Sequence, residues 1–114
     1  MINRNNPSKY YSQSVVHNDT VYLSGMIAEN YQGDMTSQCQ ETFAAIDAAL
    51  ANAGTDKSKL LSLQCWISDF SYFDDFNDAY EQWLDADSLP VRATAECALY
   101  DPRLKIEIIA IAAL

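Results

Sequence analysis

Histidine, paired cysteines and basic side chains are scarce in this chain, and each scarcity excludes a class of function. His17 is the only histidine among 114 residues, so a histidine-based metal site or a Ser-His-Asp triad lacks the residues it needs. The three cysteines are widely spaced and form no CxxC pair, which is typical of reduced thiols in a cytoplasmic protein. We therefore expect no metal and a cytoplasmic location.

The charge is one-sided, with 16 acidic against 7 basic residues and a formal net charge of -9. Such a chain repels phosphate backbones, so nucleic acid is not an expected partner. A small anionic ligand is compatible with it, because one arginine at contact distance outweighs the global field. No apolar window approaches the length of a membrane span, and the first residues lack the apolar core of a signal peptide, so no membrane partner is expected.

Hydrophobic periodicity predicts a single α+β domain over residues 1–114, in the order β-β-α-β-α-β-β. The tight turn Asn18-Asp19 joins the first two strands. A capping box of Ser37 and Gln40 begins the first helix, and Gly54 ends it. The predicted elements are strands at 13–17 and 20–24, a helix at 36–53, a strand at 60–68, a helix from Ser71 to about Asp85 with Asp74 and Asp75 in its first turn, and strands at 91–99 and 104–114.

The last predicted strand, residues 104–114, is apolar on both faces. Two helices can cover only one face of the sheet that contains it. Self-association is the simplest way to bury the other face, so the residues alone predict a homo-oligomer.

Arg92 is the first candidate for function. It shares a strand face with Thr94 and Glu96, whereas the alternate positions from Val91 to Leu99, including Cys97, are apolar and predict a buried core face. The residues alone favour a solvated face on which Arg92 pairs with Glu96, because exposed charge pairs ordinarily do little. The other interpretation is an anchor for a carboxylate, which the planar guanidinium binds with two hydrogen bonds.

Glu107 is the second candidate, because it lies between Ile106 and Ile108 in the apolar last strand. A partly desolvated carboxylate has a raised pKa and can donate or accept a proton near neutral pH. The alternative is a glutamate at the sheet edge that pairs with Lys105 on the same face. The residues favour neither interpretation.

Three further positions have ordinary structural explanations. Tyr11 suits a half-buried packing residue with a hydrated hydroxyl, and Asn77 suits the solvated side of the second helix. Gly25 ends a strand, and a glycine there would let a ligand approach the backbone N–H closely.

The segment Pro90-Val91-Arg92-Ala93-Thr94, followed by Lys105-Ile106-Glu107-Ile108, resembles the C-terminal signature of the YjgF/RidA family. The similarity covers the whole chain, through Tyr11, Ser24-Gly25 and the run Asn77-Asp78-Ala79-Tyr80-Glu81-Gln82-Trp83, in the order and spacing of that family. The C-terminal pattern is the most specific of these matches.

This resemblance implies a chorismate-mutase-like α+β fold, a mixed sheet with two helices on one face, assembled as a homotrimer with ligand sites between subunits. It implies hydrolysis of reactive enamines and imines, such as 2-aminoacrylate, 2-iminopropanoate and 2-iminobutanoate, to 2-keto acids and ammonia. No cofactor is needed for that reaction. The expected partner is therefore a small carboxylate or imino acid.

The resemblance also implies roles for single residues. Arg92 matches the arginine that holds the substrate carboxylate, and Glu107 matches the glutamate that positions or activates water. Gly25 matches a residue that contributes backbone contacts. Tyr11 and Asn77 match residues that line or support the site.

Three positions depart from the family pattern. Thr94 stands where archetypal deaminases have a pocket-lining cysteine, Ala95 where a larger aliphatic residue is usual, and Tyr100 where an aliphatic residue is usual. They indicate a distinct subgroup. One alternative function is a regulatory, non-catalytic binder of small 2-keto or carboxylic acids, and another is the holdase or endoribonuclease L-PSP-like activity attributed to some relatives, against which the negative charge counts.

The spacing of Arg92 and Glu107 raises a geometric question. In a simple hairpin of the last two strands, Glu107 would face Glu96, and Arg92 would lie roughly 13 Å further along the ladder. We expect the strand at residues 58–68 to lie between them instead, as in the resembled fold. Alternatively, the two side chains reach one substrate from different subunits.

Overall fold

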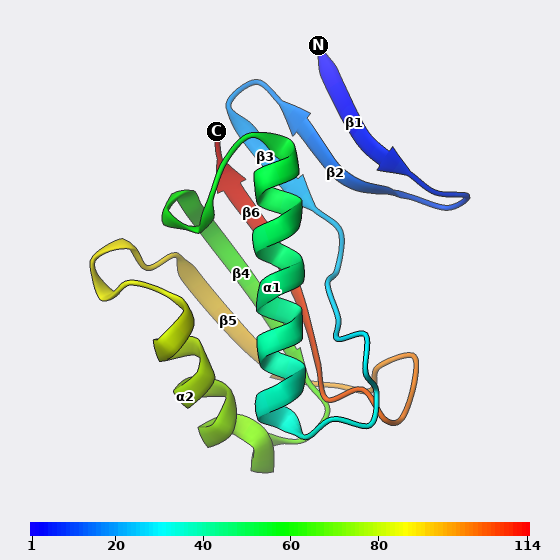
Figure 1. Ribbon diagram of the computed structural model, residues 1–114, viewed down its shortest axis with the longest axis vertical. Coiled ribbons are helices and arrows are strands. Elements are labelled where there is room, and N and C mark those ends of the chain that lie inside the picture. Colours follow the sequence, from blue (N-terminus) through cyan, green and yellow to red (C-terminus); the bar gives the residue numbers. More distant parts are fainter.

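In the computed structural model, which describes residues 1–114, two long helices pack on one face of a six-stranded sheet (Figure 1). The elements in chain order are β1 (Ile2–Pro7), β2 (Ser12–His17), β3 (Thr20–Leu23), α1 (Met35–Ala53), β4 (Leu60–Ile67), α2 (Phe73–Trp83), β5 (Val91–Glu96) and β6 (Ile106–Ala113), with short 3-10 turns at Lys57–Lys59, Phe70–Tyr72 and Ala86–Ser88. This confirms the predicted α+β class and the expectation that both helices cover the same face.

The strands lie in the order β1-β2-β3-β6-β4-β5. Neighbouring strands are antiparallel except for β4 and β5, which run parallel. The last strand, β6, therefore lies in the middle of the sheet, and β4 separates it from β5. The expected insertion of the 60–68 strand is confirmed, and the simple hairpin of β5 and β6 is wrong.

Strand β1 was not among the predicted elements. Its sequence, INRNNP, has no apolar alternation, and almost all of it is exposed. It joins the sheet through backbone pairing with β2 and through a 3.0 Å hydrogen bond from the Asn5 side-chain amide to Ser14 Oγ. The turn between β2 and β3 is the predicted one, with Asn18 at a positive φ of 55°.

Helix α1 begins one residue earlier than predicted and uses a different cap. Asp34 is its N-cap and accepts a 2.8 Å hydrogen bond from the backbone N–H of Ser37, so the predicted capping box of Ser37 and Gln40 is wrong. An aspartate at the N-cap satisfies an otherwise free helix N–H. Gly54 ends the helix in the left-handed conformation, φ 92°, as predicted.

Helix α2 begins later and ends earlier than predicted. Residues Phe70–Tyr72 form a 3-10 turn that Asp69 caps through the backbone N–H of Ser71, and the α-helix then runs from Phe73 to Trp83. Asp74 and Asp75 lie in its first turn, where negative charge complements the helix dipole. None of the helices has the length and apolarity needed to cross a membrane.

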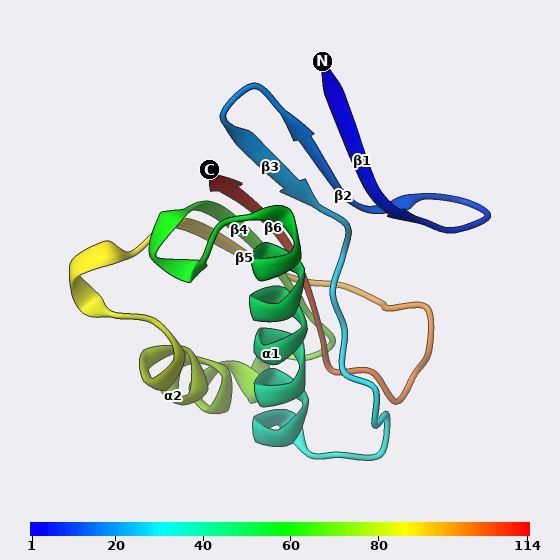
Figure 2. The ribbon, with the colours of Figure 1, turned by 45° about the horizontal axis from the view of Figure 1, so that its top comes forward.

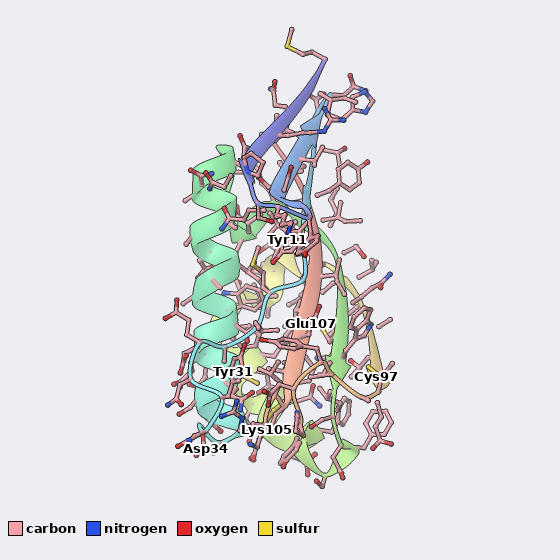
Figure 3. All side chains as sticks on the ribbon, turned by 90° about the vertical axis from the view of Figure 1, so that its right-hand side faces the viewer. Tyr11, Tyr31, Asp34, Cys97, Lys105 and Glu107 are labelled. Atoms are coloured by element: carbon pink, nitrogen blue, oxygen red, sulfur yellow. The ribbon has the colours of Figure 1, made fainter.

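The core fills the space between the helices and the covered face of the sheet (Figure 2). In β6, alternate residues are fully buried on this face, among them Ile106 and Ile108, while Glu107, Ile109 and Ile111 point to the other face and are half-buried. Figure 3 shows α1 on one side of the sheet and no helix on the other. The strand that is apolar on both faces thus has one covered and one uncovered face.

Strand β5 ends at Glu96 rather than Leu99, and its faces are the reverse of those expected. Arg92 pairs with the buried Leu63 of β4 and Thr94 with the buried Cys65, so both lie on the helix-covered side. The apolar positions of β5 are exposed on the uncovered side. Cys97 lies beyond the strand and is half-buried, so its predicted place in the core is wrong.

Candidate functional site

Helix α2 holds the Arg92 side chain against the rings of Phe73, Phe76 and Tyr80, which we call the aromatic seat. The guanidinium carbon lies 4.7 Å from the ring centre of Tyr80, 5.0 Å from that of Phe76 and 5.8 Å from that of Phe73. Arg92 Nη1 donates a 2.9 Å hydrogen bond to Asn77 Oδ1. The four helix residues recur at the spacing of one helix face, so a single element fixes the position of the cation.

Arg92 has no carboxylate partner in the chain. The only salt bridge joins Arg103 to Asp101. Glu96, which the alternative interpretation paired with Arg92, instead accepts a 2.8 Å hydrogen bond from the backbone N–H of Phe70. Most of the guanidinium donors are therefore free for an external anion.

An open cleft of about 590 Å³ lies beside this arginine. Its wall is formed by α2 and by the connection from α2 to β5. The lining residues are Asn77, Tyr80, Glu81, Leu84, Ala86, Leu89 and Arg92. The cleft combines four apolar residues with the cation of Arg92, the amide of Asn77 and the carboxylate of Glu81, a mixture typical of a site for a small organic molecule.

Thr94 lies two residues further along β5 on the same side. Its hydroxyl oxygen is buried and has no hydrogen-bond partner. A buried hydroxyl ordinarily has a partner, and the chain supplies none to this one.

Glu107 occupies the uncovered face of the sheet, against the backbone of Gly25. A Cβ atom added to Gly25 would collide with the Glu107 carboxylate, so glycine is required for this packing. Burial raises the pKa of the Glu107 carboxyl above its ordinary value. The alternative pairing with Lys105 is wrong, because Lys105 Nζ donates to the Gly33 carbonyl at 3.2 Å.

A second cavity, of about 310 Å³, surrounds this carboxylate. It is lined by Tyr11, Ser24, Gly25, Ile27, Tyr100 and Glu107. Figure 3 shows Tyr11 and Glu107 along the sheet, with Tyr31 and Lys105 at the end of the molecule below them. The structure thus brings Tyr11, Gly25 and Glu107 together, and separately brings Arg92, Asn77 and Thr94 together.

The two groups lie on opposite faces of one sheet. Glu107 pairs with the outward-facing Trp66 of β4, whereas Arg92 pairs with the inward-facing Leu63 of the same strand. Paired residues point to the same face, so Arg92 and Glu107 point in opposite directions. Within one chain, they cannot both contact one small molecule.

Sequence reasoning missed the aromatic seat of Arg92 and the involvement of Tyr100. The seat had a signal, because Phe73, Phe76 and Tyr80 share the helix face of Asn77. Tyr100 had no such signal: it follows β5 in an irregular loop, and only the folded chain places it beside Glu107.

The family model described as "Endoribonuclease L-PSP" matches residues 1–114. The RutC family protein YoaB of Escherichia coli (strain K12) is 37% identical over 103 residues, which cover 90% of each protein. A protein of Bos taurus named 2-iminobutanoate/2-iminopropanoate deaminase is 28% identical over 108 residues, covering 90% of this chain and 78% of that protein.

Among solved structures, NMB1025 of Neisseria meningitidis, a member of the YjgF protein family, superimposes with a TM-score of 0.96 at 30% identity, covering 99% of this chain and 94% of the other. The similarity therefore extends over the fold and almost the whole length of the chain. The chain belongs to the YjgF/RidA family, which the Endoribonuclease L-PSP model describes.

Proposed function

We propose that this chain hydrolyses 2-imino acids and their enamine tautomers, such as 2-aminoacrylate, 2-iminopropanoate and 2-iminobutanoate, to 2-keto acids and ammonia. The observation that carries this proposal is the Arg92 guanidinium, an unpaired cation seated between aromatic rings beside an open cleft. The imine deaminase name of the Bos taurus relative gives further support. We expect a cytoplasmic enzyme that needs no cofactor.

The site is proposed to form between two copies of the chain in a homotrimer. Arg92 of one copy would face the Glu107 cavity of the next, because the two residues of a single copy lie on opposite faces. The uncovered face offers an apolar surface for such association, with Trp66 36%, Tyr22 45% and Val91 71% exposed. A surface of this kind on a small protein marks an interaction site.

The proposed chemistry needs an anion clamp, a base and an acid. Arg92 binds the substrate carboxylate through its free N–H groups, a charge-assisted contact of about 1.5–3 kcal/mol. Ionised Glu107 accepts a proton from water as the water oxygen attacks C2 of the imine. The protonated carboxyl returns that proton to the imine nitrogen, which gives a carbinolamine with a hydroxyl and an amine on C2. Glu107 then accepts the hydroxyl proton and delivers it to the amine nitrogen, so the C2–N bond breaks, ammonia leaves and the C2–O bond becomes the keto group.

A second candidate is a non-catalytic binder of small 2-keto or carboxylic acids. It is favoured by the completeness of the Arg92 seat within one chain, where Asn77 and three rings hold the guanidinium without any contribution from Glu107. Ribonuclease activity is not proposed, because 16 acidic residues against 7 basic ones oppose binding of a phosphate backbone.

The test of the proposed activity generates 2-aminoacrylate or 2-iminobutanoate with a dehydratase, or the corresponding imine with an amino-acid oxidase. Imine decay is then followed with and without the protein. We expect acceleration by wild type, with loss of both turnover and 2-keto-acid binding in Arg92→Ala. Glu107→Gln should lose turnover and keep most of the binding. Binding without any acceleration by wild type would establish the binder instead.

Mixed oligomers test the two-chain site. Arg92→Ala and Glu107→Gln chains are each expected to be inactive alone, but a site shared between copies would be intact where an Arg92 and a Glu107 from different chains meet. Random assembly of equal amounts should restore about a quarter of the wild-type activity. Mixed oligomers with no recovered activity would overturn the site shared between two copies.

A further inference from the structure

Tyr100 forms one wall of the Glu107 cavity, although nothing in β5 or β6 holds it there. It lies in the loop between those strands, and its side chain is 71% exposed. A tyrosine so exposed would ordinarily sample several rotamers. Its placement therefore depends on contacts outside its own loop.

The side chain of Tyr31 supplies these contacts. The hydroxyls of Tyr31 and Tyr100 are hydrogen-bonded to each other, and their rings meet edge to face, with centres 6.1 Å apart. Arg103 lies over the Tyr31 ring at 5.2 Å, and Asp101 fixes the Arg103 guanidinium with two hydrogen bonds of 3.0 Å. Tyr31 is thus held on one side and holds Tyr100 on the other.

The backbones of the two loops are also tied together. The buried Gln38 side chain donates to the carbonyls of Tyr31, Gly33 and Arg103 and accepts a 2.8 Å hydrogen bond from the backbone N–H of Lys105. In Figures 1 and 2 the two loops, cyan and orange, lie side by side. The hydrogen bonds of Gln38 therefore hold the two loops that carry Tyr31 and Tyr100 in fixed positions relative to each other.

We propose that Tyr100 determines substrate specificity by restricting the Glu107 cavity to 2-imino acids with small side chains, and that Tyr31 is the residue that positions it. The inference rests on the proposed imine hydrolysis at this site. The cavity of about 310 Å³ already contains Glu107 on one wall and the Tyr100 ring on another. A benzyl side chain directed toward that wall would meet the Tyr100 ring, whereas a methyl or ethyl group would stop short of it.

The experiment compares kcat/KM for an alanine-derived imine with kcat/KM for a phenylalanine-derived imine, both made by an amino-acid oxidase. In Tyr100→Leu, the ratio of the large to the small substrate should rise about tenfold or more, as expected when a pocket wall is removed. Tyr31→Phe keeps the ring but removes the hydroxyl contact, so the ratio should rise about threefold, with most of the change in KM of the large substrate. A ratio of two substrates is insensitive to partial loss of folded enzyme.

Tyr10→Leu is the matched control, because Tyr10 is 83% exposed and does not line the cavity. Its ratio should equal that of wild type. An unchanged ratio in an active Tyr100→Leu enzyme would overturn the role of Tyr100 and leave the proposed function intact.

Binding of pyruvate and phenylpyruvate, measured by calorimetry, separates the two failures. If wild type turns over no imine, the proposed function fails, but a gain in phenylpyruvate affinity in Tyr100→Leu would still support the restriction. Equal binding of both acids by wild type and variant, without turnover, would overturn both.

Discussion

The two faces of the sheet are built from the same strands but differ in what covers them and in how deeply their side chains are buried. The helix-covered face carries Ile106 and Ile108 with no exposed area, and one functional candidate, Arg92, at its edge beneath α2. The uncovered face carries half-buried Ile109 and Ile111 and the half-buried carboxylate of Glu107. The first face is covered within one chain, whereas the second has no helix over it, and the proposed homotrimer would cover it with another copy.

The largest expected effect comes from placing a charge on the uncovered face. Ile111→Asp puts a carboxylate at the centre of the proposed contact between copies, where an unpaired buried charge costs several kcal/mol. We expect the oligomer to dissociate to monomers, measured by size-exclusion chromatography with light scattering. Ala44→Asp, on the exposed side of α1, adds the same charge and should leave the assembly unchanged. If wild type is already a monomer, the uncovered face is not an interface between copies.

Truncating one isoleucine on each face of β6 compares how much the two faces contribute to stability. Ile108→Ala opens a cavity in the covered core and should lower the free energy of unfolding by about 2–5 kcal/mol at every protein concentration. Ile111→Ala should cost about 1 kcal/mol in the isolated chain, and more as protein concentration rises, because its remaining burial comes from association. Urea unfolding followed by tryptophan fluorescence at two concentrations measures both. Equal, concentration-independent losses would mean that the uncovered face has no partner.

Gly25→Ala tests whether the position of Glu107 matters more than its presence. The new Cβ collides with the Glu107 carboxylate, which is the flexible end of a side chain, so the carboxylate moves and the fold survives. We expect imine turnover to fall about 10- to 100-fold, as for other displaced catalytic groups, with thermal stability nearly unchanged. Full activity in Gly25→Ala would show that Glu107 does not act from this position.

The pH dependence of activity and of stability tests Glu107, the carboxylate on the uncovered face. Burial raises the pKa of Glu107, so kcat/KM should fall with decreasing pH at a higher value than an ordinary glutamate would give, since the ionised form accepts the proton from water. The folded chain also binds this proton more readily than the unfolded chain, so wild type should gain stability relative to Glu107→Gln as pH falls through that pKa. Asp69 and Asp101, whose hydrogen bonds lower their pKa values, act in the opposite direction at lower pH. A kinetic pH profile of wild type measures the first effect, and urea titrations of wild type and Glu107→Gln at several pH values measure the second.

The covered face could largely be predicted from sequence, because burial against helices imposes a period on both partners. In the 36–53 helix, Cys39, Phe43, Ile46 and Leu50 lie in the core as expected, and Ala53 packs against it. In the 60–68 strand, Leu63, Cys65 and Ile67 are buried as expected, but the prediction for Leu61 is wrong: it is 49% exposed, where the pairing with β6 shifts register between Leu60 and Ser62. Strand β1 could not be predicted, since its polar residues show no apolar alternation and join the sheet mainly through backbone hydrogen bonds. Propensity and periodicity depend on side chains, so they do not detect a strand that is held mainly by backbone pairing.

Arg92 and Thr94 show a second limit of prediction from the sequence. Alternation in β5 correctly separated Arg92 and Thr94 from Val91 and Ala93, but it could not tell which set faces the helices. The apolar set is the exposed one in a single chain. Strand periodicity identifies two faces, and only the register with β4 assigns each to a side.

The smallest expected effect concerns Asn77, the one polar contact that the covered side gives to Arg92. Asn77→Ala removes a 2.9 Å hydrogen bond, yet the rings of Phe76 and Tyr80 still hold the guanidinium. Because one hydrogen bond to a charged group contributes about 1.5 kcal/mol or somewhat less where other contacts remain, 2-keto-acid affinity should fall about three- to tenfold. Calorimetric titration measures it, with Asp78→Ala, on the exposed side of the same helix turn, as the control. A loss as complete as that in Arg92→Ala would mean that the aromatic seat does not hold the cation by itself.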